Sequence, residues 1–243
     1  MSNFETATME ASLYLIPVEI AEGATERTLP AANLAIVKTL REFIVENVRT
    51  ARRCLRRWDR EFPIDECTFF ELNEHTRPEE VSAMLQPLRE GRSMGVMSEA
   101  GCPAVADPGA QAVAIAQREG RRVVPLTGPS SILLALMGSG FNGQGFAFNG
   151  YLPVKEAEKA KAVREFEVRA LRHGQTQIFI EAPYRNDKLI RFLAETLRPD
   201  TLLCVACDIT DAERESIVTR PAREWRKVTT AYDKRPAIFL IGG

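Results

Sequence analysis

Two loops rich in glycine and proline hold the residues of this chain that are best suited to binding a ligand. The first covers residues 100–109, "AGCPAVADPG", and the second covers residues 127–131, "TGPSS". Each follows an apolar run, and glycine lets a ligand approach backbone N–H and C=O groups without a side chain in between. One such loop is typical of any tight turn between a strand and a helix. Two of them at two adjacent strand ends predict a ligand site.

The common cofactor and nucleophile motifs are missing from the sequence. No GxGxxG follows a predicted strand, and neither a GxxxxGK[ST] phosphate loop nor a GxSxG elbow occurs. The two histidines, His75 and His173, leave little material for a Ser-His-Asp triad. A slot lined by backbone and poor in titratable groups suits a reaction in which the cofactor brings its own activated group.

Charge and cysteine usage exclude several classes of protein. The formal net charge of −1 gives no global attraction to nucleic acid or membrane, so a basic partner-binding surface has to be local. Five cysteines without framework spacing are typical of reduced thiols in the cytoplasm. Cys204 and Cys207 lie three apart in a predicted strand and face opposite sides, so no metal site is expected. We expect a cytoplasmic protein, because neither a signal peptide nor an apolar run of about 18 residues is recognisable.

The elements that position the two loops alternate between strand and helix. The predicted strands of the first half, with helices between them, are residues 12–18, 42–46, 67–72, 93–100 and 121–128. Apolar strands that alternate with helices predict a parallel α/β sheet. Thr76 and Glu79 have capping-box spacing and predict the start of a helix that continues to about Leu88. We expect two α/β lobes, residues 1–127 and 128–243.

Five stretches of the sequence resemble, in order, the successive motifs of the tetrapyrrole methylase superfamily of S-adenosylmethionine-dependent methyltransferases. These stretches are "VMSEAGCPAVADPG", "VVPLTGPSSILLAL", "SGF", "FAFNGYLP" and "IFIEAPYR". They are most similar to the bacterial branch that methylates the 2′-hydroxyl of a cytidine in small-subunit ribosomal RNA. The resemblance runs from about Leu13 to Leu240 and is most specific between Ser98 and Arg185. It implies an N-terminal lobe with a mainly parallel sheet, a C-terminal lobe with a mixed sheet, S-adenosylmethionine in the cleft between the lobes, and a homodimer.

The resemblance also implies which residues contact the cofactor, mostly through the main chain. These are Pro17, Ala100, Gly101, Cys102, Val105, Ser130, Ser131, Glu181, Ala182, Asp208, Ile209, Pro236 and Ala237. Residues on the acceptor side depart from the ribosomal branch: its "TPIGN" strand end is "IPVEIAEG" here, and the acid of its "AEDTR" is Asn47. The sequence therefore predicts the cofactor more firmly than the substrate.

The methyl acceptor stays open at this stage. Glu74, His75 and Glu181 are the candidates for a general base that takes the proton of a hydroxyl acceptor. A basic stripe at helical spacing is formed by Arg49, Arg52, Arg53, Arg56, Arg57 and Arg60. It is compatible with a solvated helix face and with a phosphate footprint for RNA. An RNA ribose hydroxyl is the leading hypothesis; the alternatives are a small corrinoid- or porphyrin-like acceptor and a cofactor-binding module without turnover.

Overall fold

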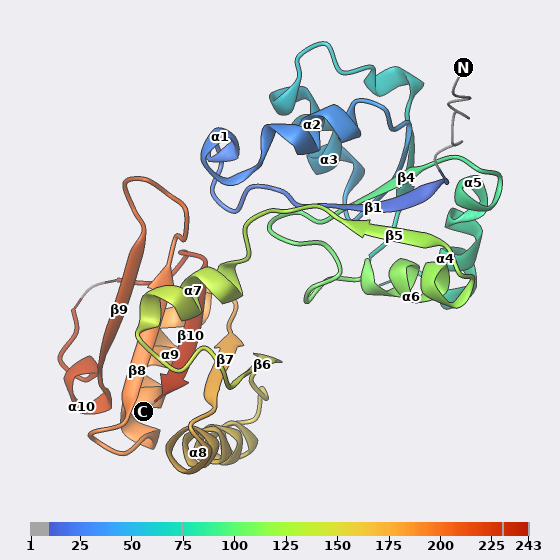
Figure 1. Cartoon of the computed structure of the whole chain (residues 1–243). Coiled ribbons are helices and arrows are strands. Elements are labelled where there is room, and N and C mark those ends of the chain that lie inside the picture. Colours follow the sequence, from blue (N-terminus) through green and yellow to red (C-terminus); the bar gives the residue numbers. More distant parts are fainter. Residues whose placement is uncertain (1–9, 74, 230, 243) are drawn as a thin grey trace, which may run out of the picture. The chain divides into compact units, whose positions relative to one another are not determined.

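The computed structural model describes residues 10–73, 75–229 and 231–242 (Figure 1). The chain divides into two compact units, an N-terminal unit of residues 1–129 and a C-terminal unit of residues 130–243. This division lies two residues beyond the boundary expected between residues 127 and 128.

The N-terminal unit is built on a parallel sheet of five strands. Its strands are β1 (Ser12–Ile16), β2 (Glu42–Val45), β3 (Thr68–Glu71), β4 (Met94–Met97) and β5 (Arg122–Pro125). Their order in the sheet is β3-β2-β4-β1-β5, and all neighbouring pairs are parallel, which confirms the predicted parallel sheet. Leu13 of β1 pairs with Met94 on one side and with Val123 on the other.

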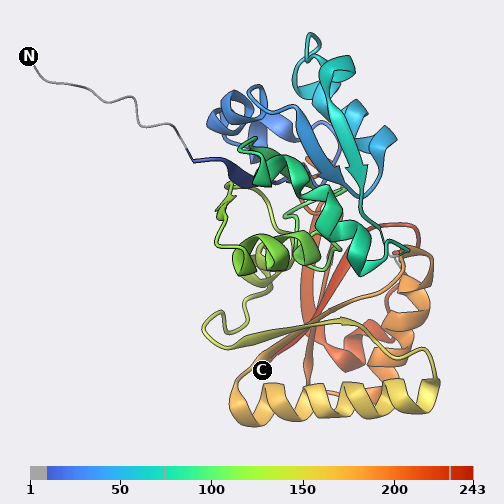
Figure 2. The ribbon, with the colours of Figure 1, turned by 90° about the vertical axis from the view of Figure 1, so that its right-hand side faces the viewer.

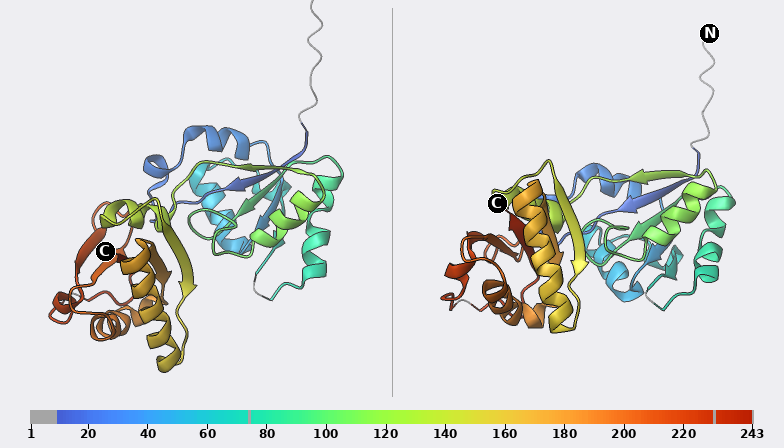
Figure 3. Two further views of the ribbon diagram at one scale, coloured as in Figure 1. Left: turned by 60° about the horizontal axis from the view of Figure 1, so that its bottom comes forward. Right: turned by 90° about the horizontal axis from the view of Figure 1, so that it is seen from below.

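Helices cover both faces of this sheet (Figure 3). They are α1 (Thr25–Thr28), α2 (Ala31–Val37), α3 (Val48–Trp58), the 3-10 helix η1 (Ile64–Glu66), α4 (Pro78–Met84), α5 (Gln86–Arg89) and α6 (Ala110–Arg118). Alternate residues of a strand point to opposite faces. Ile16 therefore packs with Leu55 in the cluster under α2 and α3, whereas Leu13 packs with Leu85 in the cluster under α4, α5 and α6.

The predicted capping box at Thr76 and Glu79 is wrong by one residue. Helix α4 begins at Pro78, and the Glu80 carboxylate accepts a hydrogen bond from the Arg77 N–H at 3.2 Å. Proline is favoured at the first helical position because its missing N–H would have no partner there. The Thr76 hydroxyl instead accepts from a backbone N–H in the preceding turn.

The C-terminal unit contains a mixed sheet, as the resemblance implied. Its strands are β6 (Phe146–Tyr151), β7 (Thr176–Ile180), β8 (Leu202–Cys207), β9 (Ser216–Pro221) and β10 (Ala237–Gly242). Their order is β6-β7-β10-β8-β9. Strands β6 and β7 are parallel, and every other pair is antiparallel. The last strand of the chain therefore lies at the centre of the sheet.

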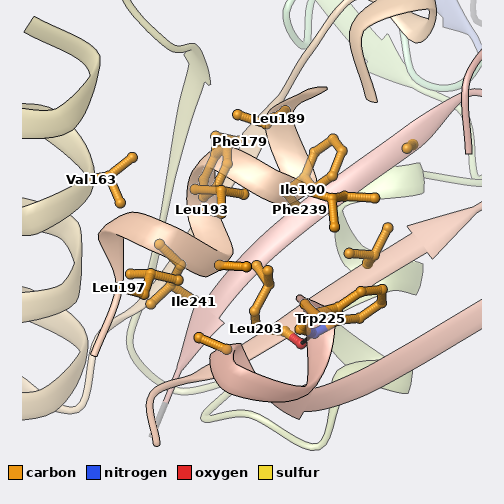
Figure 4. Packing of buried hydrophobic residues seen from close by; sticks show 14 of the residues in the cluster. Val163, Phe179, Leu189, Ile190, Leu193, Leu197, Leu203, Trp225, Phe239 and Ile241 are labelled. Atoms are coloured by element: carbon orange, nitrogen blue, oxygen red, sulfur yellow. Dashed lines mark hydrogen bonds between the residues drawn. The ribbon is translucent and has the colours of Figure 1, made fainter. Parts of the chain in front are cut away.

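The helices of this unit are α7 (Ser131–Ser139), α8 (Glu156–His173), the 3-10 helix η2 (Pro183–Arg185), α9 (Asn186–Thr196) and α10 (Ala222–Trp225). Three of them, α8, α9 and α10, pack with the sheet in a large apolar cluster (Figure 4). Helices α8, α9 and α10 contribute Val163, Leu193 and Trp225 to the cluster, where these residues meet Phe179 and Phe239 of the sheet. Helix α8 is the long straight helix of Figure 2. Helix α7 packs on β9 and β10.

Candidate functional site

The carboxyl ends of β4, β1 and β5 lie side by side at one edge of the N-terminal sheet, because these strands are parallel neighbours. The two glycine-rich loops were expected at adjacent strands, but β1 lies between β4 and β5. The chain leaves β1 toward α2 on one face and leaves β4 toward α6 on the other. Two adjacent strands whose connections leave in opposite directions form a topological switch point, where open α/β sheets bind ligands.

A backbone bridge joins the loops after β1 and β4 at this switch point. The Val18 N–H donates to the Gly101 carbonyl oxygen at 2.9 Å, and the Gly101 N–H donates to the Val18 carbonyl oxygen at 3.0 Å. Gly101 has a φ of +73°, a conformation that strains any residue with a Cβ. The glycine at this position is therefore required by the backbone itself.

Asp107 organises the rest of the loop between β4 and α6, although it was not among the residues expected to have a role. Its Oδ1 accepts from the N–H groups of Ala104 at 2.9 Å and Gly109 at 2.6 Å. Ala104 and Ala106 have φ values of 66° and 57°, which alanine rarely adopts without such support. Burial raises the pKa of Asp107, against the opposing effect of the two N–H donors. The Asp-Pro-Gly sequence is a turn signal by which this residue could have been found.

The loop after β5 packs directly against the other two loops. A Cβ at Gly128 would lie 2.3 Å from two ring carbons of Pro17, so only glycine allows this approach. The Cys102 thiol donates to the Pro129 carbonyl oxygen at 3.3 Å. The structure thus brings the predicted contacts Pro17 and Cys102 together with the second glycine-rich loop.

The loop after β4 presents small side chains and backbone to its surroundings. Ala100 and Val105 are exposed, Gly101 is buried, and Cys102 is half-buried. Between residues 100 and 105, Cys102 is the sole titratable side chain, and burial raises the pKa of its thiol. Residues 100–105 are therefore suited to contacts through N–H and C=O groups and carry no charged side chain.

The predicted contacts of the C-terminal unit that follow β7 and β8 or begin β10 lie at one edge of its sheet. Strand β10 runs antiparallel to β7 and β8, so its amino end meets their carboxyl ends. Cys207 pairs with Ala237, and the Asp208 N–H donates to the Pro236 carbonyl oxygen at 3.0 Å. Residues far apart in the sequence thus become neighbours in this unit.

The side chain of Asp208 is committed to ion pairs. Its Oδ2 accepts from Arg235 Nε at 2.7 Å and lies 3.3 Å from Arg214 Nη2. Asp208 and the following Ile209 are 7% and 4% exposed. The positive φ of Asp208, 48°, turns the chain sharply at the end of β8. Its predicted contact with the cofactor is thus left to the main chain.

Glu181, proposed from sequence both as a cofactor contact and as a base, is also paired. Its carboxylate lies 3.8 Å from Lys159 Nζ and 4.0 Å from Arg185 Nη1, and it accepts from the Ala182 N–H at 2.9 Å. Together with residues of α8 and α9 it lines a pocket of 490 Å³. The carboxylate therefore has two cations within 4.0 Å and one hydrogen-bonded N–H before any acceptor approaches.

Ser130 caps helix α7. Its Oγ accepts from the Leu133 N–H at 3.5 Å, and Ser131 is the first residue of the helix. Serine at this position satisfies a backbone N–H group that the helix leaves unpaired. The hydroxyl of Ser130 thus has a local role independent of any ligand.

The other two candidate bases follow β3. Glu74 lies outside the described residues. His75 is exposed, and its backbone N–H donates to Asn73 Oδ1 at 2.9 Å. Strand β3 is two strands from β4, which corresponds to about 10 Å at the usual strand spacing. The strand order therefore separates His75 from the glycine-rich loops.

The basic stripe on α3 is divided by ion pairs. Arg52 Nη2 lies 3.0 Å from Asp65 Oδ1. Arg57 bonds the buried carboxylate of Glu19 through Nη1 and lies 2.9 Å from Glu22 through Nη2. Part of the stripe is therefore neutralised, because acidic residues from other segments pack beside the helix.

The remaining arginines of the stripe stay on the outer side of α3. Arg49 and Arg53 are exposed, and no ion pair to them occurs within the part of the chain that the structure describes. Arg56 donates to the carbonyl oxygen of Arg60, which lies beyond the end of the helix at Trp58. A smaller basic surface therefore remains at Arg49 and Arg53.

Three thiols are buried, and we call them the buried thiols: Cys54, Cys204 and Cys207. Burial raises the pKa of Cys204 to about 11 and the pKa values of Cys54 and Cys207 to about 12. In the described ranges, no group of three or more His, Cys, Asp and Glu side chains is arranged to hold a metal ion. Across the same ranges, no helix has the length and apolar character needed to cross a membrane.

Comparison with known proteins identifies the family to which these features correspond. Residues 26–225 match the family of Tetrapyrrole (Corrin/Porphyrin) Methylases. The Ribosomal RNA small subunit methyltransferase I of Vibrio cholerae serotype O1 is 30% identical over 231 residues, which are 94% of this chain and 70% of that protein. This chain spans 57% to 79% of the length of further relatives with the same name.

Solved structures share the fold at lower sequence identity. The methyltransferase CobJ superposes with a TM-score of 0.62 at 17% identity, covering 96% of this chain and 94% of its own. Uroporphyrin-III C-methyl transferase from Thermus thermophilus, complexed with S-adenyl homocysteine, gives a TM-score of 0.55 at 16% identity, covering 96% and 97%. The predicted fold class is thereby confirmed.

Proposed function

This chain belongs to the tetrapyrrole methylase family of S-adenosylmethionine-dependent methyltransferases, and we propose that it methylates a ribose 2′-hydroxyl of RNA. The observation that carries this acceptor is the relative at 30% identity, which is named for small-subunit ribosomal RNA. The exposed cations Arg49 and Arg53 on α3 support it, because clustered arginines recognise nucleic-acid phosphates.

The residues at the N-terminal switch point fit a cofactor that is held by backbone groups. Apart from its chain neighbours, a Cβ added at Gly101 would have a single atom within 4 Å, the Pro129 carbonyl oxygen at 3.6 Å, so there is room beside this backbone. We therefore place the cofactor contacts of this unit at Pro17, at residues 100–102 and at Val105. The predicted contacts of the C-terminal unit, including Ser130 and Ser131, stay part of the proposal and are to be tested separately.

Bound S-adenosylmethionine supplies a methyl group carried on a sulfonium sulfur. The task of the chain is to hold the acceptor hydroxyl in line with that group and to let its proton leave, and positioning alone can supply much of the rate. Glu181 has two cations within 4.0 Å and accepts from one backbone N–H, and His75 follows a strand two places away from β4. We propose that positioning dominates and that neither residue is an obligatory base.

The rate of a His75 variant tests whether that residue acts as a base. A general base contributes about 10²- to 10⁴-fold to a rate. We expect His75→Gln to lower kcat by less than about tenfold, which is less than the loss of a general base would cause. A loss of about 10²-fold or more, with cofactor affinity retained, would identify His75 as the base.

We also propose that the protein is a homodimer. We propose that it acts in the cytoplasm, where it would encounter an RNA acceptor. The edge strand β6 leaves Phe146 and Tyr151 40% and 67% exposed, which is compatible with a partner subunit on this side. Light scattering is expected to give about twice the chain mass of 27.1 kDa. A mass near that of one chain would contradict the dimer.

The acceptor is tested by transfer of a tritiated methyl group from S-adenosylmethionine. Small ribosomal subunits, their naked RNA and a uroporphyrin-type tetrapyrrole are offered in parallel. We expect label in RNA and, after alkaline digestion, in a dinucleotide, because a methylated 2′-oxygen cannot attack the adjacent phosphodiester. Label in the tetrapyrrole alone would replace RNA by a small acceptor. Binding of S-adenosylhomocysteine without any transfer would indicate a module without turnover.

A further inference from the structure

A buried carboxylate lies two residues beyond Pro17, in the loop after β1. Glu19 is 4% exposed, and both of its oxygens have partners. Oε1 accepts from Arg57 Nη1, and Oε2 accepts from Trp58 Nε1 at 2.9 Å. A buried charge is tolerated only where such partners compensate for lost hydration. The last turn of α3 is therefore fastened to the loop after β1.

Two neighbouring groups add to this fastening. Arg57 reaches Glu22 at 2.9 Å through its second terminal nitrogen, so one guanidinium bridges two carboxylates of the same loop. Cys54 Sγ lies 3.9 Å from the second carboxylate oxygen of Glu19. Burial, followed by the charge of Glu19, raises the pKa of Cys54 to about 12, so its thiol stays neutral. The cluster thus contains one buried negative charge and one guanidinium that neutralises it.

The fastened loop leads directly to the proposed cofactor contacts. Val18, the residue before Glu19, forms the two backbone hydrogen bonds with Gly101. Trp58, oriented by its bond to Glu19, lines a pocket of 330 Å³ together with Pro17. A shift of Glu19 would therefore move both the bridge to Gly101 and one wall beside Pro17.

We propose that Glu19 and Arg57 are positioning residues, which hold the loop after β1 and, through the Val18–Gly101 bridge, the cofactor loop after β4. Arg57 then affects cofactor binding through these loops and does not contact RNA phosphate, although it belongs to the same stripe as Arg53. The proposal rests on the proposed function only in that S-adenosylmethionine binds at these loops. The difference between "TPIGN" in the ribosomal branch and "IPVEIAEG" here then has a structural role, because it introduces Glu19, to which Arg57 and Trp58 of α3 donate.

The test measures calorimetric binding of S-adenosylhomocysteine to the full chain, without RNA. Arg57→Met leaves the buried carboxylate of Glu19 without its cationic partner, with Trp58 Nε1 still donating to it, and we expect binding at least about tenfold weaker. Combining it with Glu19→Gln removes both charges, while an amide oxygen still accepts from Trp58. We expect the double variant to recover to within about threefold of the unchanged protein. Arg53→Gln, on the exposed side of the same helix, is the matched control and is expected to bind normally.

Steady-state kinetics separate positioning from RNA contact. We expect Arg57→Met to raise KM for S-adenosylmethionine and to leave KM for RNA unchanged, and Arg53→Gln to do the reverse. If Arg57→Met raises only KM for RNA, or binds S-adenosylhomocysteine normally, the proposal is wrong.

A milder variant protects the test against misfolding. Trp58→Phe keeps an aromatic ring and removes the N–H that donates to Glu19. We expect weaker cofactor binding in the same direction as for Arg57→Met, and unchanged binding would contradict the proposal. Failure of the unchanged protein to bind would refute the cofactor site itself. If RNA proves not to be the acceptor, the calorimetric result still stands, because it is measured without RNA.

Discussion

Replacing Gly101 by alanine tests the cofactor loop most directly, because the chain offers a matched control at Gly120. Their φ values are +73° and +65°, and neither position has an atom close enough to clash with an added Cβ. Both belong to the N-terminal unit, but Gly120 follows α6 and precedes β5, at the opposite edge of the sheet. The two substitutions therefore impose the same backbone strain at different distances from the loop.

The expected magnitudes follow from this geometry. A residue with a Cβ in the left-handed region costs about 1–2 kcal/mol, so both variants should lose similar stability. At Gly101 the added methyl group enters the open space beside the loop. Loss of one backbone hydrogen bond to a ligand is worth about 1 kcal/mol, and displacement of the ligand costs more. We therefore expect affinity for S-adenosylhomocysteine to fall by about tenfold or more in Gly101→Ala and to be unchanged in Gly120→Ala.

Two measurements decide the outcome. Scanning calorimetry gives the melting temperature of the N-terminal unit, which should fall by a few degrees in both variants. Titration calorimetry gives the dissociation constant. Equal affinity in the two variants would refute the placement of the cofactor against the Gly101 backbone. A much larger loss of stability in Gly101→Ala would instead show that its Val18 bridge cannot survive the substitution.

The remaining predictions concern pH, thiols and salt. Because burial raises the pKa of Asp107, its contribution to stability is complete below the ordinary value of 3.8 and is lost as pH rises through the raised pKa. Urea unfolding should thus show the unchanged protein losing stability relative to Asp107→Asn as pH rises above 3.8, and the opposite trend would contradict this. A thiol reagent at neutral pH should modify Cys102 more slowly when S-adenosylhomocysteine is bound, and should leave the buried thiols intact until the chain unfolds. The affinity for single-stranded RNA, measured by fluorescence anisotropy, should weaken with salt. Replacing Arg49 and Arg53 by glutamine should reduce the slope of log affinity against log salt concentration by about 0.7 for each phosphate that the variant no longer binds. An unchanged slope would show that the outer side of α3 is a solvated surface without an RNA contact.

Local sequence was sufficient for the strands, the loops and the family. The apolar runs that end at the two glycine-rich loops became β4 and β5, because short apolar segments bounded by turn residues have few alternatives to buried strands. The motif order predicted the methyltransferase family, and the family match over residues 26–225 confirms it. The start of α4 was placed one residue away from Pro78, since several polar residues there can serve as caps.

Only the tertiary structure decided which of these segments meet. The insertion of β1 between β4 and β5 depends on strand pairing over long separations, which neither loop encodes locally. Arg57 has the spacing of a surface arginine and became the partner of Glu19, 38 residues away, because α3 packs beside the loop after β1. Asp107 likewise has the sequence of a turn residue, and its two hydrogen bonds to backbone N–H groups show that it shapes the loop. Periodicity and turn chemistry act between neighbours in sequence, whereas the partners of buried charges are set by how the elements pack.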